Sequence, residues 1–340
     1  MSNLLFTIII PSFNAATTIC RSLDSVYALP FQMSEFEVIV VDDGSTDETD
    51  RIVEEYGVTH ENLIQIRHLV NRNLGAARNS GIAAAKGQYV VFLDSDDELG
   101  PGIVDALELI SEKHLDMVAM QSERVDEAGR VVGQLSLPYS RDEIFSGIQL
   151  QDEHPFWNLG GCTNYLYSKS LLGKVSYPFV EGAFYEDVDF VCNHLLFAGK
   201  MSYIDKSGYR QFMNPTSITH TFSYKHVFGY AFLGVRLLSL YEKLDDKSRP
   251  FSLSVLEGGA FNIMKAFKYL LKLHSLSEVR AFYNLFDSRC NRKELWNYTE
   301  PAYCWTWWTR LGVKSRFGMV FLTTILRLLG IPNLVSRQRN

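Results

Sequence analysis

The feature that most constrains the fold is an apolar run that ends in a cluster of acids. Residues 88–93 read Gln-Tyr-Val-Val-Phe-Leu, and Asp94, Ser95, Asp96 and Asp97 follow directly. A short run of β-branched and aromatic residues predicts a strand buried on both faces, as in parallel sheets. Open α/β sheets bind ligands at the carboxyl ends of their strands, so the acids are predicted to lie at a ligand-binding edge.

The acids themselves indicate a cation. Carboxylates this close together raise one another's proton affinity unless a positive charge compensates them. The spacing of Asp94 and Asp96 suits a divalent metal ion, Mn²⁺ or Mg²⁺, held by one or two carboxylates and completed by substrate phosphates. The alternative is a solvated acidic turn, which an isolated pair of this kind would favour. The neighbouring motifs therefore decide between the two.

The first hundred residues alternate between predicted strands and helices. Strands are predicted at 4–10, 36–41, 63–68 and 88–93, with helical patterns between them. Asn14 is predicted to cap the first helix, and Ser45 with Glu48 forms a capping box for the second. This alternation indicates an α/β fold, Rossmann-like, with a mostly parallel central sheet and flanking helices. The polar clusters after the first, second and fourth strands would share one edge and form a binding crevice.

Composition and charge exclude several classes of protein. The chain has 340 residues, 46% of them hydrophobic, enough for a substantial core and two domains. Its net charge of -6 argues against nucleic acid as the main partner. Residues 1–10 contain no basic side chain, which predicts a first strand rather than a signal peptide and therefore a cytoplasmic protein. The five cysteines lack C-x-x-C spacing, which indicates reduced thiols rather than disulfides or a zinc site.

The charge is unevenly distributed along the chain. Residues 301–340 contain six basic and no acidic side chains, so this tail carries +6 and the remainder -12. Its clustered tryptophans and basic residues fit a segment lying on an anionic membrane surface. An interface between copies of the chain, or packing of this tail onto the α/β domain, explains the same pattern. The apolar stretch at 317–331 is short and interrupted by Arg327, which argues against a membrane span.

Four segments resemble the successive signatures of family 2 glycosyltransferases with the GT-A fold. They are Ile-Pro-Ser-Phe-Asn at 10–14, Val-Asp-Asp-Gly-Ser-Thr-Asp at 41–47, Gly-Ala-Ala-Arg-Asn-Ser-Gly at 75–81 and Leu-Asp-Ser-Asp-Asp at 93–97. The resemblance is close over residues 5–100 and looser to about residue 220. It implies a GT-A catalytic domain over residues 1–222, followed by a helical C-terminal region over residues 223–340 with a basic, aromatic-rich tail.

The resemblance implies a nucleotide-sugar donor, with UDP as the nucleotide. Pro11 and Phe13 would shape the nucleoside slot, although Phe13 also suits an ordinary core position. Asp43 would accept a hydrogen bond from the uracil N–H, where the alternative is a carboxylate that caps a turn. Arg78 would offer its guanidinium to the nucleotide or its diphosphate, where the alternative is a salt bridge to an acid at the same edge.

The same resemblance assigns the metal and the diphosphate. Asp96 would be the direct metal ligand, and Asp94 would lie near the ribose or the metal. Arg210 and His220 belong to a segment whose counterpart in the family closes over the donor, which makes both candidates for the diphosphate or the metal. A lone histidine is more often structural, and that alternative stands for His220.

A second acidic motif, Phe-Tyr-Glu-Asp-Val-Asp-Phe at 184–190, resembles the family's catalytic Glu-Asp motif. Attack of an acceptor hydroxyl on an anomeric carbon needs a general base on the side opposite the leaving diphosphate. The resemblance assigns this role to Asp187, and a single displacement would invert the anomeric configuration. Glu186 would orient the loop or contact the acceptor. Without the resemblance, the motif would read as a solvated helix start.

These expectations describe an inverting, metal-dependent glycosyltransferase. Its acceptor would be a saccharide or a lipid-linked oligosaccharide, as in the synthesis of bacterial surface polysaccharides. A nucleotidyltransferase is an alternative, but the glycine-rich basic first loop expected for a triphosphate is missing. A nucleotide-binding scaffold without turnover is a further alternative, and alanine at Asp187 would distinguish it because a scaffold would lose nothing.

Overall fold

The computed structural model describes most of the chain up to residue 289. The described ranges are 4–126, 128–141, 143–153, 160–175, 178–213, 223–270 and 276–289. They divide into two compact units. The first contains the described residues up to 182 together with 190–213, and the second contains 183–189 together with the helices from residue 223 onward.

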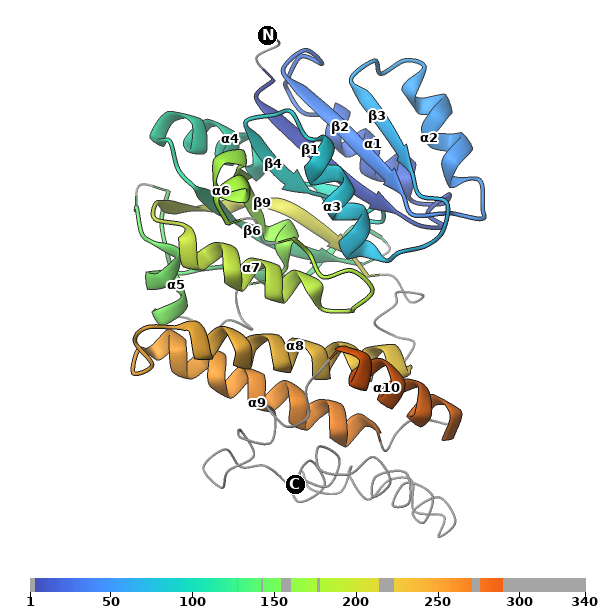
Figure 1. Ribbon diagram of the computed structural model, residues 1–340. Coiled ribbons are helices and arrows are strands. Elements are labelled where there is room, and N and C mark those ends of the chain that lie inside the picture. Colours follow the sequence, from blue (N-terminus) through green and yellow to red (C-terminus); the bar gives the residue numbers. More distant parts are fainter. Residues whose placement is uncertain are drawn as a thin grey trace. The chain divides into compact units, whose positions relative to one another are not determined.

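The first half of the first unit has the predicted alternation of strands and helices (Figure 1). Its elements are β1 (Phe6–Ser12), α1 (Ile19–Tyr27), β2 (Phe36–Asp42), α2 (Thr49–Gly57), β3 (Leu63–Arg67), α3 (Leu74–Ala84) and β4 (Tyr89–Phe92). The pairs β1–β2, β2–β3 and β1–β4 are all parallel. Ser12 lies opposite Asp42, and Asp42 lies opposite Arg67, so the carboxyl ends of three strands are level.

The second half of this unit extends the same sheet with mixed pairing. It contributes β5 (Glu98–Leu99), α4 (Gly102–Lys113), β6 (Met117–Val125), β7 (Val131–Leu135), α5 (Gly147–Glu153), β8 (Tyr165–Ser168), α6 (Lys169–Val175), α7 (Glu186–Phe197, whose first four residues group with the second unit) and β9 (Met201–Phe212). Among the described residues the strand order is β3-β2-β1-β4-β8-β6-β9-β5, with β7 beside β6. β8 is antiparallel to β4 and β6, whereas β9 is parallel to β6.

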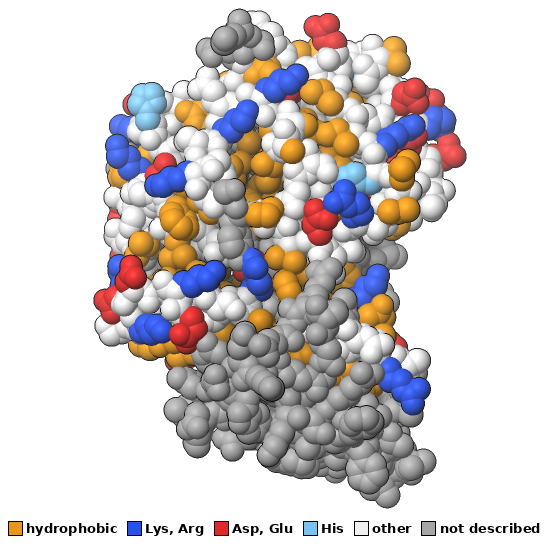
Figure 2. Space-filling model, in the orientation of Figure 1, with side chains coloured by type: hydrophobic (Ala, Val, Ile, Leu, Met, Phe, Trp, Pro, Cys, Tyr) orange, Lys and Arg blue, Asp and Glu red, His pale blue; other side chains and the backbone are white. Residues whose placement is uncertain are grey.

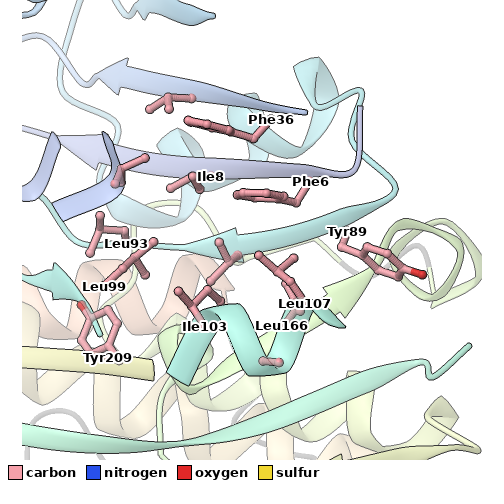
Figure 3. Close-up of a cluster of buried hydrophobic side chains, with 14 of the residues drawn as sticks. Phe6, Ile8, Phe36, Tyr89, Leu93, Leu99, Ile103, Leu107, Leu166 and Tyr209 are labelled. Carbon is pink, nitrogen blue, oxygen red and sulfur yellow. The ribbon is translucent and has the colours of Figure 1, made fainter. Parts of the chain in front are cut away.

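The central strands β1, β2 and β4 are buried on both faces, as their apolar sequences predict. One face packs on α1 and α4, and Figure 3 shows Phe6, Ile8 and Phe36 in one cluster with Ile103 and Leu107 of α4. Residues on the other face, such as those at alternate positions of β1 and β2, are equally buried. Full burial of one such side chain contributes about 1.5–3 kcal/mol, so this core fixes the strand register and hence the edge that carries the polar loops.

The second unit contains three described helices, α8 (Tyr224–Lys243), α9 (Pro250–Leu270) and α10 (Leu276–Arg289). Two glycines allow α8 and α9 to approach closely. A Cβ atom added at Gly234 would lie 2.5 Å from Cγ1 of Ile263, and one added at Gly259 would lie 2.8 Å from Cδ2 of Leu238. The helical spacing of buried Ile263 and Leu270 agrees with this packing.

The surface carries charges of both signs. Basic and acidic side chains are interspersed with apolar ones over the described part of the face in Figure 2. Within the described ranges, no helix has both the length and the apolar character needed to cross a bilayer. The segment at 301–340, for which membrane or partner contact is predicted, lies outside the described residues.

Candidate active site

The loops after β1 and β2 are tied together by polar side chains. Asn14, in the left-handed region at φ +50, accepts a hydrogen bond from the Thr46 amide through Oδ1 at 2.8 Å. The Asn14 amide donates to Ser45 Oγ at 2.9 Å. The two predicted helix caps are therefore wrong: α1 begins at Ile19 after Thr18, and α2 begins at Thr49 after Glu48. Both side chains join the neighbouring strand-end loop instead.

Asp43 is a buried carboxylate of this edge, held on two sides. It is only 2% exposed, and its Oδ1 lies 2.6 Å from Nδ1 of His68. The backbone N–H of Arg72 is shared between Oδ1 and Oδ2, at 3.0 Å from each. The other ring nitrogen of His68 lies 2.8 Å from Ser80 Oγ on α3. This chain of contacts fixes the orientation of the Asp43 carboxylate.

Arg78 and Asp94 form an ion pair at the end of β4. Nη2 of Arg78 donates to Oδ1 of Asp94 at 2.8 Å, and the guanidinium lies 5.3 Å from the centre of the Phe179 ring. The Arg78 side chain is only 4% exposed. Because a buried guanidinium is costly without a counter-charge, Asp94 stabilises Arg78 and Arg78 in turn orients Asp94.

The residue after Arg78 fastens a distant segment to α3. Asn79 donates from Nδ2 to the Phe179 carbonyl at 2.9 Å, and its Oδ1 accepts from the Phe179 amide at 2.9 Å. Arg72 pairs with Glu181 at 2.7 Å in the same region. Three consecutive side chains of α3, at positions 78–80, therefore connect β4, the segment around residue 179 and His68.

The three carboxylates of the acidic turn after β4 differ in their exposure to solvent. Asp94 and Asp96 are partly exposed, whereas Asp97 is buried. Asp97 accepts hydrogen bonds from the Tyr209 hydroxyl at 2.5 Å and from the Phe212 amide at 2.7 Å. Burial, reinforced by the neighbouring charges of Asp94 and Asp96, raises the pKa of Asp97 to about 8. Asp97 thus connects the turn to β9. Asp94 and Asp96, which are partly exposed, are the pair that could bind a cation.

The donor set at this turn fits a hard divalent ion that needs substrate oxygens to complete its coordination. Asp94 and Asp96 supply carboxylate oxygens of the kind that such an ion prefers. No cluster of three or more His, Cys, Asp or Glu side chains suited to a metal occurs in the described part of the chain. His220, predicted as a third ligand, lies outside the described residues.

Arg210, predicted to contact the diphosphate or the metal, is paired with acids of the sheet. It lies on β9, and its Nη1 donates to Glu98 Oε2 at 2.8 Å. Its Nε is 3.7 Å from Glu123 Oε2, and its Nη2 donates to the Gly129 carbonyl at 3.3 Å. The guanidinium is therefore occupied by the sheet and the β6–β7 hairpin in this state.

The second acidic motif forms the first turn of α7 and belongs to the second unit. Glu186 is buried and Asp187 is partly exposed. Asp189 is buried and pairs with Arg236 of α8, with 3.0 Å between Oδ2 and Nη2. Desolvation raises the pKa of Asp189 to about 7, while the adjacent guanidinium favours the charged carboxylate. Of the three acids, Asp187 combines a position at the helix start with access to solvent.

Residues 7–174 match the family model described as Glycosyl transferase family 2. Through this segment the chain belongs to that family. The uncharacterised glycosyltransferase EpsJ of Bacillus subtilis (strain 168) is 30% identical over 219 residues, which is 63% of this chain and 63% of EpsJ. The matched stretch thus spans less than two thirds of that relative.

Solved structures show the same GT-A fold. The structure of Staphylococcus aureus TarS 1–349 in complex with UDP-GlcNAc aligns with a TM-score of 0.65 at 22% identity, covering 96% of this chain and 92% of that one. A mannosyltransferase from Pyrobaculum calidifontis, in complex with GDP-Man and Mn²⁺, aligns with a TM-score of 0.53 at 14% identity, covering 96% and 87%.

The predicted residues of the first unit converge on one edge of this family 2 sheet. Pro11 lies opposite Val41 near the end of β1, and the 44% exposed Phe13 directly follows Ser12, the last residue of that strand. The Asp43 amide donates to the Ser12 carbonyl at 2.8 Å, and Arg78 contacts Asp94 as described. Asp96 lies in the same turn as Asp94.

Sequence reasoning missed several residues that hold this site. His68, Asn79 and Tyr209 orient Asp43, the segment around residue 179 and Asp97. One signal for His68 was available, because it directly follows a strand that is parallel to β2 and therefore ends at the same edge. The partners of Asn79 and Tyr209 are about a hundred residues away in the chain, and no local pattern indicates them.

Proposed function

We propose that this chain is an inverting glycosyltransferase that moves a sugar from a nucleotide-sugar donor to a hydroxyl acceptor. The observation that carries the proposal is the buried Asp43 carboxylate, held by His68 and the Arg72 amide at the strand-end edge of a family 2 fold. A rigid, desolvated acceptor of this kind is suited to reading one N–H group of a nucleobase.

The donor would bind along the edge that contains Asp43 and the acidic turn. Among the described residues, Oδ2 of Asp43 takes only the shared Arg72 hydrogen bond, so it retains acceptor capacity for the N–H of uracil. Pro11 and Phe13 would border the base. The TarS structure contains UDP-GlcNAc, which supports a UDP-sugar as the donor.

The diphosphate would lie at the turn after β4. Asp96 and the second oxygen of Asp94 would hold Mn²⁺ or Mg²⁺, and the bound ion would stabilise negative charge on the leaving diphosphate. The Mn²⁺ in the mannosyltransferase structure supports this assignment. Arg78 would act on the donor through Asp94, whose carboxylate it orients. Arg210 would have to leave Glu98 before it could reach a phosphate.

Asp187 would remove the proton from the acceptor hydroxyl as the new bond forms. Its place in the first turn of α7 favours the ionised form, because helix N-termini stabilise negative charge. One displacement without a covalent intermediate inverts the anomeric centre. Burial of Glu186 supports a role in orienting the loop rather than in direct contact with the acceptor.

The segment at 301–340 bears on which acceptor the enzyme uses and where it meets that acceptor. A saccharide or lipid-linked oligosaccharide at a membrane surface would suit the basic, tryptophan-rich segment at 301–340, which would then bind the membrane peripherally. Contact between copies of the chain is the competing use of that segment. A sedimentation experiment with anionic vesicles distinguishes the two uses.

The test measures binding of a panel of UDP- and GDP-sugars by calorimetry, with Mn²⁺ and with EDTA. Asp96→Asn is compared with wild type, and the exposed Asp245→Asn is the matched control. We expect one donor to bind only with Mn²⁺ and Asp96→Asn to weaken it roughly tenfold or more, since even outer groups of metal sites change affinity 10- to 100-fold. Binding indifferent to both Mn²⁺ and Asp96 would contradict the proposal.

A further inference from the structure

One face of α8 supports the segment that carries Asp187. His226, Gly229, Tyr230 and Arg236 recur at helical spacing, and each meets a residue between 184 and 189. Such spacing places the four residues along one side of the helix. All of these contacts lie within the second unit.

The approach of the segment to α8 is close. The rings of Phe184 and His226 are 4.7 Å apart. A Cβ atom added at Gly229 would lie 2.9 Å from the Phe184 carbonyl oxygen and 3.0 Å from Cδ2 of Tyr185. Only glycine at this position leaves room for the backbone that leads into α7.

Tyr185 adopts a conformation that needs external support. Its φ of +65 is in the left-handed region, which is unfavourable for a bulky side chain. Its ring stacks on Tyr230 with centroids 4.4 Å apart and an interplanar angle of 20°. Such conformations persist when surrounding contacts determine them, and Tyr230 supplies these contacts.

Further contacts hold the Tyr230 ring and Asp189, which lies beyond Asp187 in the acidic motif. The Nζ atom of Lys265, on α9, lies 4.0 Å from the centre of the Tyr230 ring, and Tyr269 meets the same ring edge-on at 5.9 Å. On the other side of Asp187, Asp189 is anchored by Arg236. Asp187 is therefore flanked by two residues that α8 holds in place.

We propose that Tyr230, supported by Lys265, is a positioning residue that holds Tyr185 and so aims the general base Asp187. This inference rests on the proposed function, which assigns the base. Tyr230 need not touch the substrate. Its effect is geometric, because a base displaced by about 1 Å can lose on the order of 100-fold in rate.

The first test uses water as the acceptor and measures UDP release from UDP-GlcNAc with Mn²⁺. We expect Tyr230→Ala to lower kcat roughly 10- to 100-fold while KM for the donor stays within about twofold. Tyr230→Phe keeps the stacked ring and should recover most of the rate. Tyr241→Ala is the matched control, because Tyr241 lies on the same helix and also has a lysine over its ring. Equal kcat for Tyr230→Ala and Tyr241→Ala would overturn the proposal.

The second test needs no substrate. Hydrogen exchange of residues 183–190 should be roughly tenfold faster in Tyr230→Ala than in Tyr241→Ala, since the local structure loses its support. Unchanged exchange would overturn the positioning role even if UDP release fell. Asp187→Asn tests the proposed function separately. Full activity of that variant would refute Asp187 as the base, whereas the exchange result tests only whether Tyr230 positions residues 183–190.

Discussion

Asp97 is the buried carboxyl of the acidic turn after β4, and its surroundings raise its pKa. Its hydrogen bonds to the Tyr209 hydroxyl and the Phe212 amide favour the carboxylate, yet burial and the charges of Asp94 and Asp96 outweigh them and raise its pKa to about 8. The folded chain therefore keeps a proton that the unfolded chain releases near its ordinary pKa of 3.8. Burial is the main cause of this retained proton, and the neighbouring charges of Asp94 and Asp96 add to it.

The raised pKa of Asp97 predicts pH-dependent stability. Its contribution to the free energy of unfolding is fully present below pH 3.8 and is lost as the pH rises through 8, with a slope of up to about 1.4 kcal/mol per pH unit. We expect Asp97→Asn to remove this slope in urea denaturation with EDTA present. Asp205→Asn, an exposed acid on the same strand, is the control and should keep it. Parallel pH profiles for wild type and Asp97→Asn would contradict the prediction.

Single-residue predictions from the sequence were least reliable at loop residues. Asn14 and Ser45 have the right chemistry and spacing for helix caps, but in the structure they bind each other's loops. A cap is a local contact, whereas these bonds link positions about thirty residues apart. The sequence contains the polar groups, and only the packing of β1 beside β2 decides which partner they find.

Helix α3 contacts several parts of the site because it packs directly on the sheet. A Cβ atom added at Gly81 would lie 2.3 Å from Cγ2 of Ile9 on β1. This close approach brings the side chains at 78–80 to Asp94, the segment near residue 179 and His68. The glycine that ends the 75–81 motif is therefore required by packing.

Gly81→Ala tests this packing. A β-branched neighbour such as Ile9 cannot rotate its Cγ2 aside freely, so we expect a loss of about 1–3 kcal/mol in the free energy of unfolding. Gly173→Ala in α6 is the matched control, because an added Cβ there meets nothing within 4 Å. That variant should gain up to about 1 kcal/mol from helix propensity. Similar stability changes in the two variants, measured by urea denaturation, would refute the close-packing account.

Strands were predicted well from the sequence where burial alone determines that a segment is a strand. β1, β2 and β4 are buried along their whole length, whereas β3 is only partly buried. The antiparallel insertion of β8 between β4 and β6 was not foreseen, since pairing order depends on contacts far apart in the chain. No local periodicity distinguishes a parallel neighbour from an antiparallel one.

At the scale of the whole molecule, the acidic motifs belong to different compact units. Asp94 and Asp96 follow β4 in the first unit, whereas Asp187 groups with α8 and α9 in the second. The sequence predicts both motifs by resemblance, but it places the second in the catalytic domain at 1–222. The contacts that attach residues 183–189 to α8 are ring stacking, a glycine approach and one buried ion pair, none of which has a local signature.

We propose that the strand-end edge recognises a nucleotide base through Asp43, and calorimetry with UDP and CDP in Mn²⁺ tests this recognition. The two ligands share their phosphates, but only uracil presents a ring N–H to a carboxylate. We expect wild type to prefer UDP by roughly 10- to 100-fold, the value of a hydrogen bond to a charged group, and Asp43→Asn to lose that preference. A melting curve of the variant checks that the loop remains folded. Equal affinity of wild type for UDP and CDP would contradict the account.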